Sequence, residues 1–132
     1  MSQLFREIIL DYYTNPRNKG SISKPSAFAS DWNPLCGDKI KFEILFGEDG
    51  HVSQAKYNGD GCAISQVCAS MLTEKIQGLT AKQMGKIGEK EVIGMLGVDI
   101  SPARKKCALL GWLVMRKALK LDASGALAQS LK

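Results

Sequence analysis

The feature that most constrains the fold is a stretch of alternating apolar and mostly polar residues at 39–46. Such alternation predicts a strand with one buried and one mostly polar face. Glu48-Asp49-Gly50 then predicts a hairpin turn, and a return strand is expected over about 51–57. Two or three antiparallel strands need helices to cover their apolar face. The sequence therefore predicts an α+β fold.

Apolar residues recur at helical spacing on both sides of the hairpin. The first helix should end near Thr14, because Pro16 disfavours helical geometry in the residue before it. The last long helix should begin at Ser101-Pro102, which combines a capping serine with a proline in the first turn. We expect one domain over residues 1–132, with a small antiparallel three-stranded sheet covered on one face by helices. The expected elements are helix 2–14, an edge strand near 28–32, strands 38–46 and 51–57, and helices 63–77, 80–84, 89–96 and 101–121.

The overall composition argues against several classes of function. No apolar run approaches the roughly 20 residues that span a bilayer, and Arg6 and Glu7 interrupt any signal pattern at the start. A cytoplasmic location and no membrane partner are therefore expected. The formal net charge is +5, but aromatic residues make up only 7% of the chain and do not alternate with basic ones, so no nucleic-acid partner is expected. A solvated surface or an acidic protein partner explains the charge better.

Four cysteines lie far apart in the sequence, at positions 36, 62, 68 and 107. The chain is cytosolic in character and long enough to build a core without disulfides, so metal binding or thiol chemistry is the preferred interpretation. Cys68 follows Cys62 on one predicted helix but points to roughly the opposite side, which predicts a packed core thiol. The only histidine, His51, is expected to be a solvated turn residue. A histidine-rich zinc site is therefore excluded.

Residues 33–38, Asn-Pro-Leu-Cys-Gly-Asp, place a cysteine and a carboxylate two positions apart. Pro34 restrains the backbone and Gly37 allows a tight turn. A strand that begins at Asp38 can aim Cys36 and Asp38 the same way, and a thiolate with a carboxylate suits zinc or iron. The alternative is a turn that begins a strand, with Cys36 as a small buried apolar residue. This stretch alone leaves both interpretations open.

The predicted hairpin brings a second cysteine to the same place. Residues 58–61 form another sharp turn before Cys62, and antiparallel pairing of the two strands would place Cys62 beside Cys36. Cys62 also begins a predicted helix, whose unpaired N–H groups favour a thiolate. Cys107 follows Lys105 and Lys106, whose charges act in the same direction. Three thiolate-prone cysteines favour metal or thiol chemistry over three inert core residues.

Three motifs carry a resemblance to a known family. They are Asn-Pro-x-Cys-Gly-Asp at 33–38, Gly-x-Gly-Cys-Ala-Ile-Ser at 59–65 and Arg-x-x-Cys-Ala-Leu at 104–109. In this order and spacing they resemble the U-type iron–sulfur assembly proteins, which include IscU, SufU and the amino-terminal domain of NifU. The resemblance covers nearly the whole chain. It implies an IscU/SufU-like fold and a scaffold or sulfur acceptor served by a cysteine desulfurase of the IscS, SufS or NifS type.

The resemblance also assigns expected roles to single residues. Cys36, Cys62 and Cys107 would be the cluster ligands or the thiols that accept persulfide sulfur. Asp38 would be the carboxylate that can ligate zinc and makes an assembled cluster labile. The implied cofactor is a [2Fe-2S] cluster or Zn²⁺ at the same site, and apo iron–sulfur proteins are implied partners. Lys106 stands where IscU-type proteins have a histidine, and it is a candidate auxiliary residue in sulfur delivery or thiolate stabilisation.

Two further departures concern the branch of the family. Residues 100–104, Ile-Ser-Pro-Ala-Arg, stand in place of the Leu-Pro-Pro-Val-Lys segment by which a chaperone recognises IscU-type proteins. Dependence on an Hsp70-type chaperone is therefore doubtful. The spacing between Cys62 and Cys107 lacks the insertion that SufU-type chains typically carry and is closer to that of IscU.

Three hypotheses for the function remain open. The first is a scaffold that accepts persulfide sulfur and iron, assembles a labile [2Fe-2S] cluster and transfers it to apo-proteins. The second is a SufU-like zinc-dependent sulfurtransferase that accepts sulfur from a SufS-type desulfurase. The third is a structural zinc-binding interaction module, which the glycine-rich turns and the carboxylate in the ligand set disfavour. In the first two, the chain is a scaffold or sulfur acceptor rather than a conventional enzyme.

Overall fold

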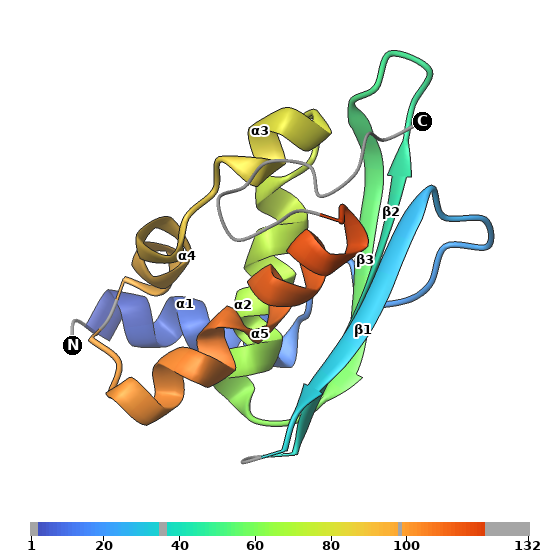
Figure 1. Ribbon diagram of the computed structural model, residues 1–132. Helices are drawn as coiled ribbons and strands as arrows, with labels where there is room; N and C mark the ends of the chain where they lie inside the picture. The colour runs from blue at the N-terminus through green and yellow to red at the C-terminus, as the bar shows by residue number, and fades with distance from the viewer. Residues whose placement is uncertain (1–2, 35–36, 98, 121–132) are drawn as a thin grey trace.

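The computed structural model describes residues 3–34, 37–97 and 99–120 (Figure 1). The three strands form one antiparallel sheet in the order β1-β2-β3, and the helices lie on one face of it (Figure 1). The predicted α+β fold is therefore confirmed. The elements are α1 (Gln3–Thr14), β1 (Ala27–Asn33), β2 (Asp38–Phe46), β3 (Val52–Asp60), α2 (Ala63–Lys75), α3 (Ala81–Gly85), α4 (Glu89–Leu96) and α5 (Pro102–Ala118).

Strands β2 and β3 form the predicted antiparallel hairpin, and β3 continues to Asp60, beyond the expected end at 57. Lys39 pairs with Asp60 at one end and Phe46 pairs with Val52 at the other, beyond a register shift. The turn closes through the Gly47 N–H, which donates to the His51 carbonyl at 2.8 Å. The start of β2 and the end of β3 therefore lie side by side at the open end. The core face of the hairpin is formed by Ile40, Phe42, Ile44, Val52, Ala55 and Tyr57, all of which are buried.

Helix α2 is the central element of the helical layer, because every residue from Ser65 to Thr73 is buried. Helix α5 packs against both α2 and the sheet (Figure 1). The approach of the two helices is close at Gly111, where a Cβ would lie 3.3 Å from Ala69. The first turns of α2 and α5 lie near the open end of the hairpin, where Cys62 and Cys107 approach Asp38.

Glu43 is buried, although the alternation places it on the mostly polar face of β2. The residue is only 5% exposed, and the segment between α1 and β1 passes behind the sheet (Figure 1). Gly20 in that segment donates its N–H to the Tyr57 carbonyl at 2.9 Å, and Ile22 is buried. The surface loop expected over 15–24 is thus partly a cover for the second face of the sheet.

The helix boundaries follow the predicted capping residues. Thr80 accepts a hydrogen bond from the Gln83 N–H and forms a capping box that begins α3. Ser101 caps α5, with Pro102 in the first turn. Helix α5 ends at Ala118 with Leu119 as its cap, before the predicted end at 121, and residues 121–132 lie outside the described residues. None of the described helices is long and apolar enough to cross a membrane.

Candidate metal and thiol site

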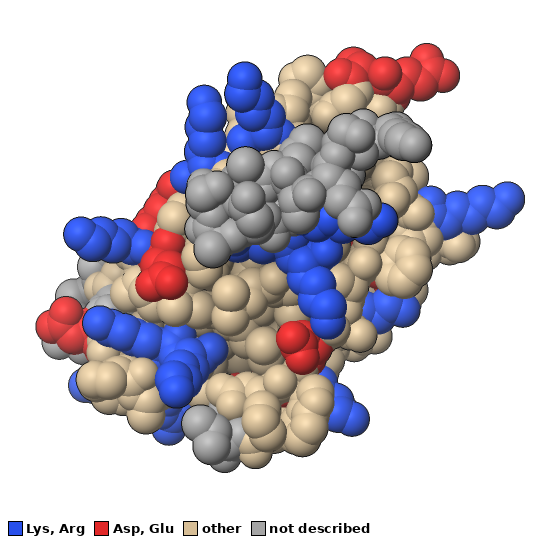
Figure 2. Space-filling view, in the orientation of Figure 1, with Lys and Arg blue, Asp and Glu red and all other residues tan. Residues whose placement is uncertain are grey.

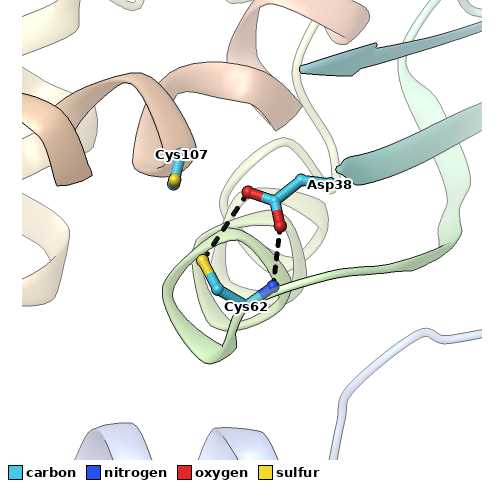
Figure 3. Close-up of side chains that lie close together, drawn as sticks. All are labelled: Asp38, Cys62 and Cys107. Carbon is cyan, nitrogen blue, oxygen red and sulfur yellow. Dashed lines mark hydrogen bonds between the residues drawn. The ribbon is translucent and has the colours of Figure 1, made fainter. Parts of the chain in front are cut away.

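Three potential metal ligands from three different elements converge at the open end of the hairpin (Figure 3). Asp38 is the first residue of β2, Cys62 is the N-cap of α2, and Cys107 lies in the second turn of α5. One carboxylate oxygen and the two Sγ atoms all lie within 4.8 Å of one another. Asp38 and Cys107 are buried and Cys62 is partly exposed. The site is therefore open to solvent at one thiol.

Asp38 binds the start of α2 through both of its oxygens. Oδ1 accepts the Cys62 backbone N–H at 2.7 Å, and Oδ2 lies 3.6 Å from the Cys62 Sγ, which donates to it. The Cys62 side chain makes no capping hydrogen bond of its own, so the fully buried Asp38 carboxylate supplies an acceptor for one of the first N–H groups of the helix. Asp38 thus positions Cys62 as well as offering an oxygen ligand.

Two glycines let the chain pass close to β2 just before Cys62. Gly61 has a φ of +140°, and a Cβ there would lie 2.1 Å from Asp38 Oδ1. Gly59 has a φ of +156°, and a Cβ there would lie 2.0 Å from the Lys39 carbonyl. Any side chain at either position would displace the backbone or Asp38. Sequence reasoning missed the contact between Asp38 and the Cys62 N–H, although the Gly-x-Gly spacing before Cys62 was a signal of close backbone approach.

Three basic residues precede Cys107 in the sequence, but Cys107 itself is buried. Arg104, Lys105 and Lys106 are exposed on the first two turns of α5, whose first turn holds no acidic residue. Cys107 itself faces Asp38 and Cys62 (Figure 3). Lys106 therefore lies beside the site in sequence while its side chain is in solvent, and its auxiliary role remains a prediction.

The three described ligand atoms lie close enough together to bind one metal ion, all within 4.8 Å of one another. Tetrahedral zinc, with Zn–S near 2.3 Å and Zn–O near 2.0–2.2 Å, would separate a sulfur and an oxygen ligand by about 3.5 Å. The observed Cys62 Sγ–Asp38 Oδ2 separation is 3.6 Å. Two thiolates and one carboxylate also suit iron. Cys36 lies outside the described residues, so the complete set of Cys36, Asp38, Cys62 and Cys107 remains a prediction.

The other two candidate groups lie apart from the site. Cys68 is 2% exposed, and burial raises the pKa of its thiol to about 12. The thiol is therefore neutral at physiological pH, as expected of a packed core residue. His51 is exposed at the hairpin turn, where its Nδ1 lies 3.4 Å from Asp49 Oδ2. Both predictions, a core thiol and a solvated turn histidine, are confirmed.

Comparison with known proteins decides the family. A family profile described as the NifU-like N terminal domain matches residues 4–122. The chain belongs to the NifU-like N-terminal domain family. The resemblance seen in the three cysteine motifs is thereby confirmed.

Relatives within this family carry two different descriptions. The chain is 36% identical over 142 residues to the zinc-dependent sulfurtransferase SufU of Bacillus subtilis, covering 95% of each protein. It is 32% identical over 133 residues to the iron–sulfur cluster assembly scaffold protein IscU of Thermotoga maritima, covering 89% of this chain and 93% of the relative. The alignment with the Bacillus protein is longer than this chain, so that relative has residues with no counterpart here.

A solved structure shares the fold. It is the crystal structure of a protein from Fervidobacterium islandicum AW-1, described as a candidate iron–sulfur cluster assembly scaffold for the SUF system. The TM-score is 0.70 at 28% sequence identity, with 89% of this chain and 98% of that chain covered. The IscU/SufU-like fold implied by the motifs is therefore the fold of this chain.

Proposed function

We propose that this chain is an iron–sulfur cluster assembly scaffold. It accepts persulfide sulfur from a cysteine desulfurase, takes up iron, assembles a labile [2Fe-2S] cluster and passes the cluster to apo-proteins of the cytoplasm. Family membership supports this class of function. The observation that carries the proposal is the convergence of two thiols and a buried carboxylate from three elements. Cys36 would supply the fourth ligand.

The sulfur-accepting step needs only thiol chemistry. A thiolate of this chain attacks the outer sulfur of the donor's cysteine persulfide, and a new S–S bond forms on this chain. The donor's S–S bond breaks and its electron pair leaves with the donor's cysteine thiolate, so no external oxidant is consumed. Cys36, Cys62 and Cys107 are the proposed acceptors. Partial exposure and a place at a helix amino terminus support Cys62 in this role.

Asp38 suits a site that must release what it binds. A carboxylate oxygen is a weaker match than a thiolate for a soft iron–sulfur cluster. The other oxygen of this carboxylate, Oδ1, accepts the Cys62 N–H. Asp38 therefore keeps a hydrogen bond when it is not bound to the cluster. We therefore assign Asp38 as the weak ligand that makes the cluster transferable.

A zinc-dependent sulfurtransferase is the second candidate, because the separation of Cys62 Sγ and Asp38 Oδ2 matches ligation of one ion. The 36% identity to a zinc-dependent sulfurtransferase supports it, as does Lys106 in place of a histidine. In this function Cys36, Asp38, Cys62 and Cys107 hold Zn²⁺ and one cysteine takes sulfur from the desulfurase. A purely structural zinc module is disfavoured, since closed structural sites use Cys and His ligands and Cys62 here is partly exposed.

Metal analysis after anaerobic purification, and persulfide analysis after reaction with the desulfurase and cysteine, test these functions. Reconstitution then adds iron and a thiol reductant, which supplies the electrons that reduce persulfide sulfur to sulfide. The scaffold proposal predicts a [2Fe-2S] absorbance spectrum and cluster transfer to an apo-ferredoxin. Zinc that stays bound, together with persulfide on the chain and faster desulfurase turnover, would instead support the sulfurtransferase function and contradict the scaffold function. No persulfide on any cysteine and no effect on turnover would contradict both.

A further inference from the structure

An apolar groove of about 440 Å³ opens beside the metal and thiol site. It lies between α1 and the starts of α2 and α5, and Arg6, Asp99, Ser101 and Arg104 stand around it. The groove reaches Ala63, the residue that follows Cys62 in the chain. The apolar floor is formed by Ile9, Leu10, Tyr13, Ala63, Ile64 and Ile100.

Helix α1 carries two large apolar side chains in the groove, Leu10 and Tyr13, that the core does not use. The groove residues of α1 are at positions 6, 9, 10 and 13, which is the i, i+3, i+4, i+7 spacing of one helical face. The core-facing side of the helix is formed by Ile8, Ile9 and Tyr12. Leu10 and Tyr13 are left 60% and 53% exposed. Exposed apolar side chains that line a groove form a surface into which a partner segment docks.

One cation of the groove, Arg104, begins a run of three basic residues. Arg104, Lys105 and Lys106 occupy the start of α5, where the helix dipole disfavours positive charge. Within the described part of the chain, no carboxylate pairs with any of the three side chains. Figure 2 shows Lys and Arg side chains gathered over the start of α5, at the lower left. A charge pattern that local helix energetics disfavour indicates a binding role.

These features together identify the occupant. We propose that the groove docks an acidic segment with apolar side chains that belongs to the protein donating sulfur. The inference rests on the proposed function, because it names the surface by which the sulfur donor reaches the site. Carboxylates of that segment meet the Arg104–Lys106 cluster while its apolar side chains enter between Leu10 and Tyr13. Its persulfide is then delivered beside Cys62.

Two other occupants fit the charges less well. A second copy of this chain, bound through the same surface, would bring two Arg104–Lys106 clusters face to face, and such like-charge contacts oppose association. An anionic membrane would require a basic amphipathic helix, but α1 carries Glu7 and Asp11 against its one arginine, Arg6. The exposed apolar side chains of α1 also line a concave groove rather than a protruding edge.

The test is the affinity of the full chain for the cysteine desulfurase of the same organism, measured by calorimetry at two salt concentrations. The double variant Leu10→Ser/Tyr13→Ser should weaken binding at least about 10-fold, as expected for loss of interface anchors. Arg104→Glu should weaken it about 3- to 10-fold and reduce its salt dependence. Arg104→Glu also replaces a cation by an acid in the first turn of α5, which favours the helix, so misfolding is not the expected cause.

Matched controls carry the same chemistry outside the groove. Leu113→Ser removes a similarly exposed leucine of α5, 52% exposed, and Lys82→Glu reverses an exposed charge on α3. Both should bind the desulfurase within twofold of wild type. Equal losses in groove and control variants, or no binding by wild type, would overturn the inference. So would groove-dependent binding to vesicles containing phosphatidylglycerol, or groove-dependent self-association, when desulfurase binding is unchanged.

Sulfur transfer is measured separately, as persulfide on the wild-type chain after reaction with the desulfurase and cysteine. Groove-dependent binding without any persulfide would contradict the proposed function and leave the docking surface standing. Persulfide transfer with no difference between groove and control variants would contradict the docking surface alone. Groove variants that still accept sulfur at saturating desulfurase would support both.

Discussion

Two cysteines on the same helix show how position decides the chemistry of a thiol. Cys62 caps the start of α2, is partly exposed and lies beside a buried carboxylate. Cys68 lies in the middle of α2 among residues that are all buried, where burial raises the pKa of its thiol to about 12. The thiol at the start of the helix is therefore placed to bind a metal or react, and the thiol in the middle contributes to packing. The following predictions test this division.

Exchanging the two thiols for hydroxyls should separate metal binding from stability. Cys62→Ser removes a proposed ligand and should abolish stoichiometric zinc binding with little change in the free energy of unfolding of the metal-free chain. Cys68→Ser buries a hydroxyl in an apolar site and should cost about 1–3 kcal/mol of unfolding free energy, with zinc stoichiometry unchanged. Chelator competition and urea unfolding measure the two effects. Loss of zinc binding in Cys68→Ser would contradict the assignment of Cys68 to packing alone.

The approach of Gly61 to Asp38 should be essential for metal affinity. Gly61→Ala places a Cβ 2.1 Å from Asp38 Oδ1, so the carboxylate or the turn before Cys62 must move. We expect zinc affinity to fall about 10- to 100-fold, as for other changes that disturb the support of metal ligands. Gly78→Ala is the matched control, because Gly78 also has a positive φ, +79°, but nothing lies within 4 Å. It should lower stability without changing zinc affinity; equal affinities in the two variants would contradict the positioning role of Asp38.

Replacing Asp38 should separate its two roles. Asp38→Ala removes the weak ligand and should make a reconstituted cluster persist longer, as measured by the decay of its visible absorbance. It also removes the acceptor of the Cys62 N–H, which should cost about 1–3 kcal/mol of unfolding free energy. Asp38→Asn keeps an acceptor for that N–H and should recover most of the stability. A cluster that decays faster in the Ala variant would overturn the assignment of Asp38 as the weak ligand.

The smallest expected effect is a pH dependence due to Cys68. Its pKa is raised in the folded state, so the folded protein holds this proton more tightly than the unfolded chain. The resulting stability is fully present below about pH 9 and is lost as pH rises toward 12. The metal-free wild type should therefore lose more unfolding free energy between pH 8 and pH 10 than Cys68→Ala does, in parallel urea titrations. Identical pH slopes would show that the buried thiol is not responsible.

Much of the fold was predictable because its signals are local. Alternation at 39–46, the turn at 48–50 and the caps Thr80 and Ser101 each specify structure within a few residues. The proximity of Asp38 and Cys62 also followed, since antiparallel strands place the start of one beside the end of the next. These local signals are confirmed by the register of the hairpin and by the capping contacts.

Long-range packing accounts for what the residues alone did not predict. The arrival of Cys107 at the site depends on how α5 crosses α2 near Gly111 and Ala69, and only the family resemblance anticipated it. The segment between α1 and β1 passes behind the sheet and pairs with β3 through Gly20 and Tyr57, which are far apart in sequence. The hydrogen bond from the Cys62 N–H to Asp38 depends on the direction of the Asp38 side chain. Sequence spacing does not encode any of these three features directly.

The proposed functions require that Cys36, Asp38, Cys62 and Cys107 bind one metal at a single site. X-ray absorption at the zinc edge of the zinc-loaded chain tests this requirement most directly. We expect three sulfur ligands near 2.3 Å and one oxygen ligand near 2.0–2.2 Å, with the oxygen contribution altered in Asp38→Ala. Two or fewer sulfur ligands, or an unchanged spectrum in that variant, would contradict the four-ligand site.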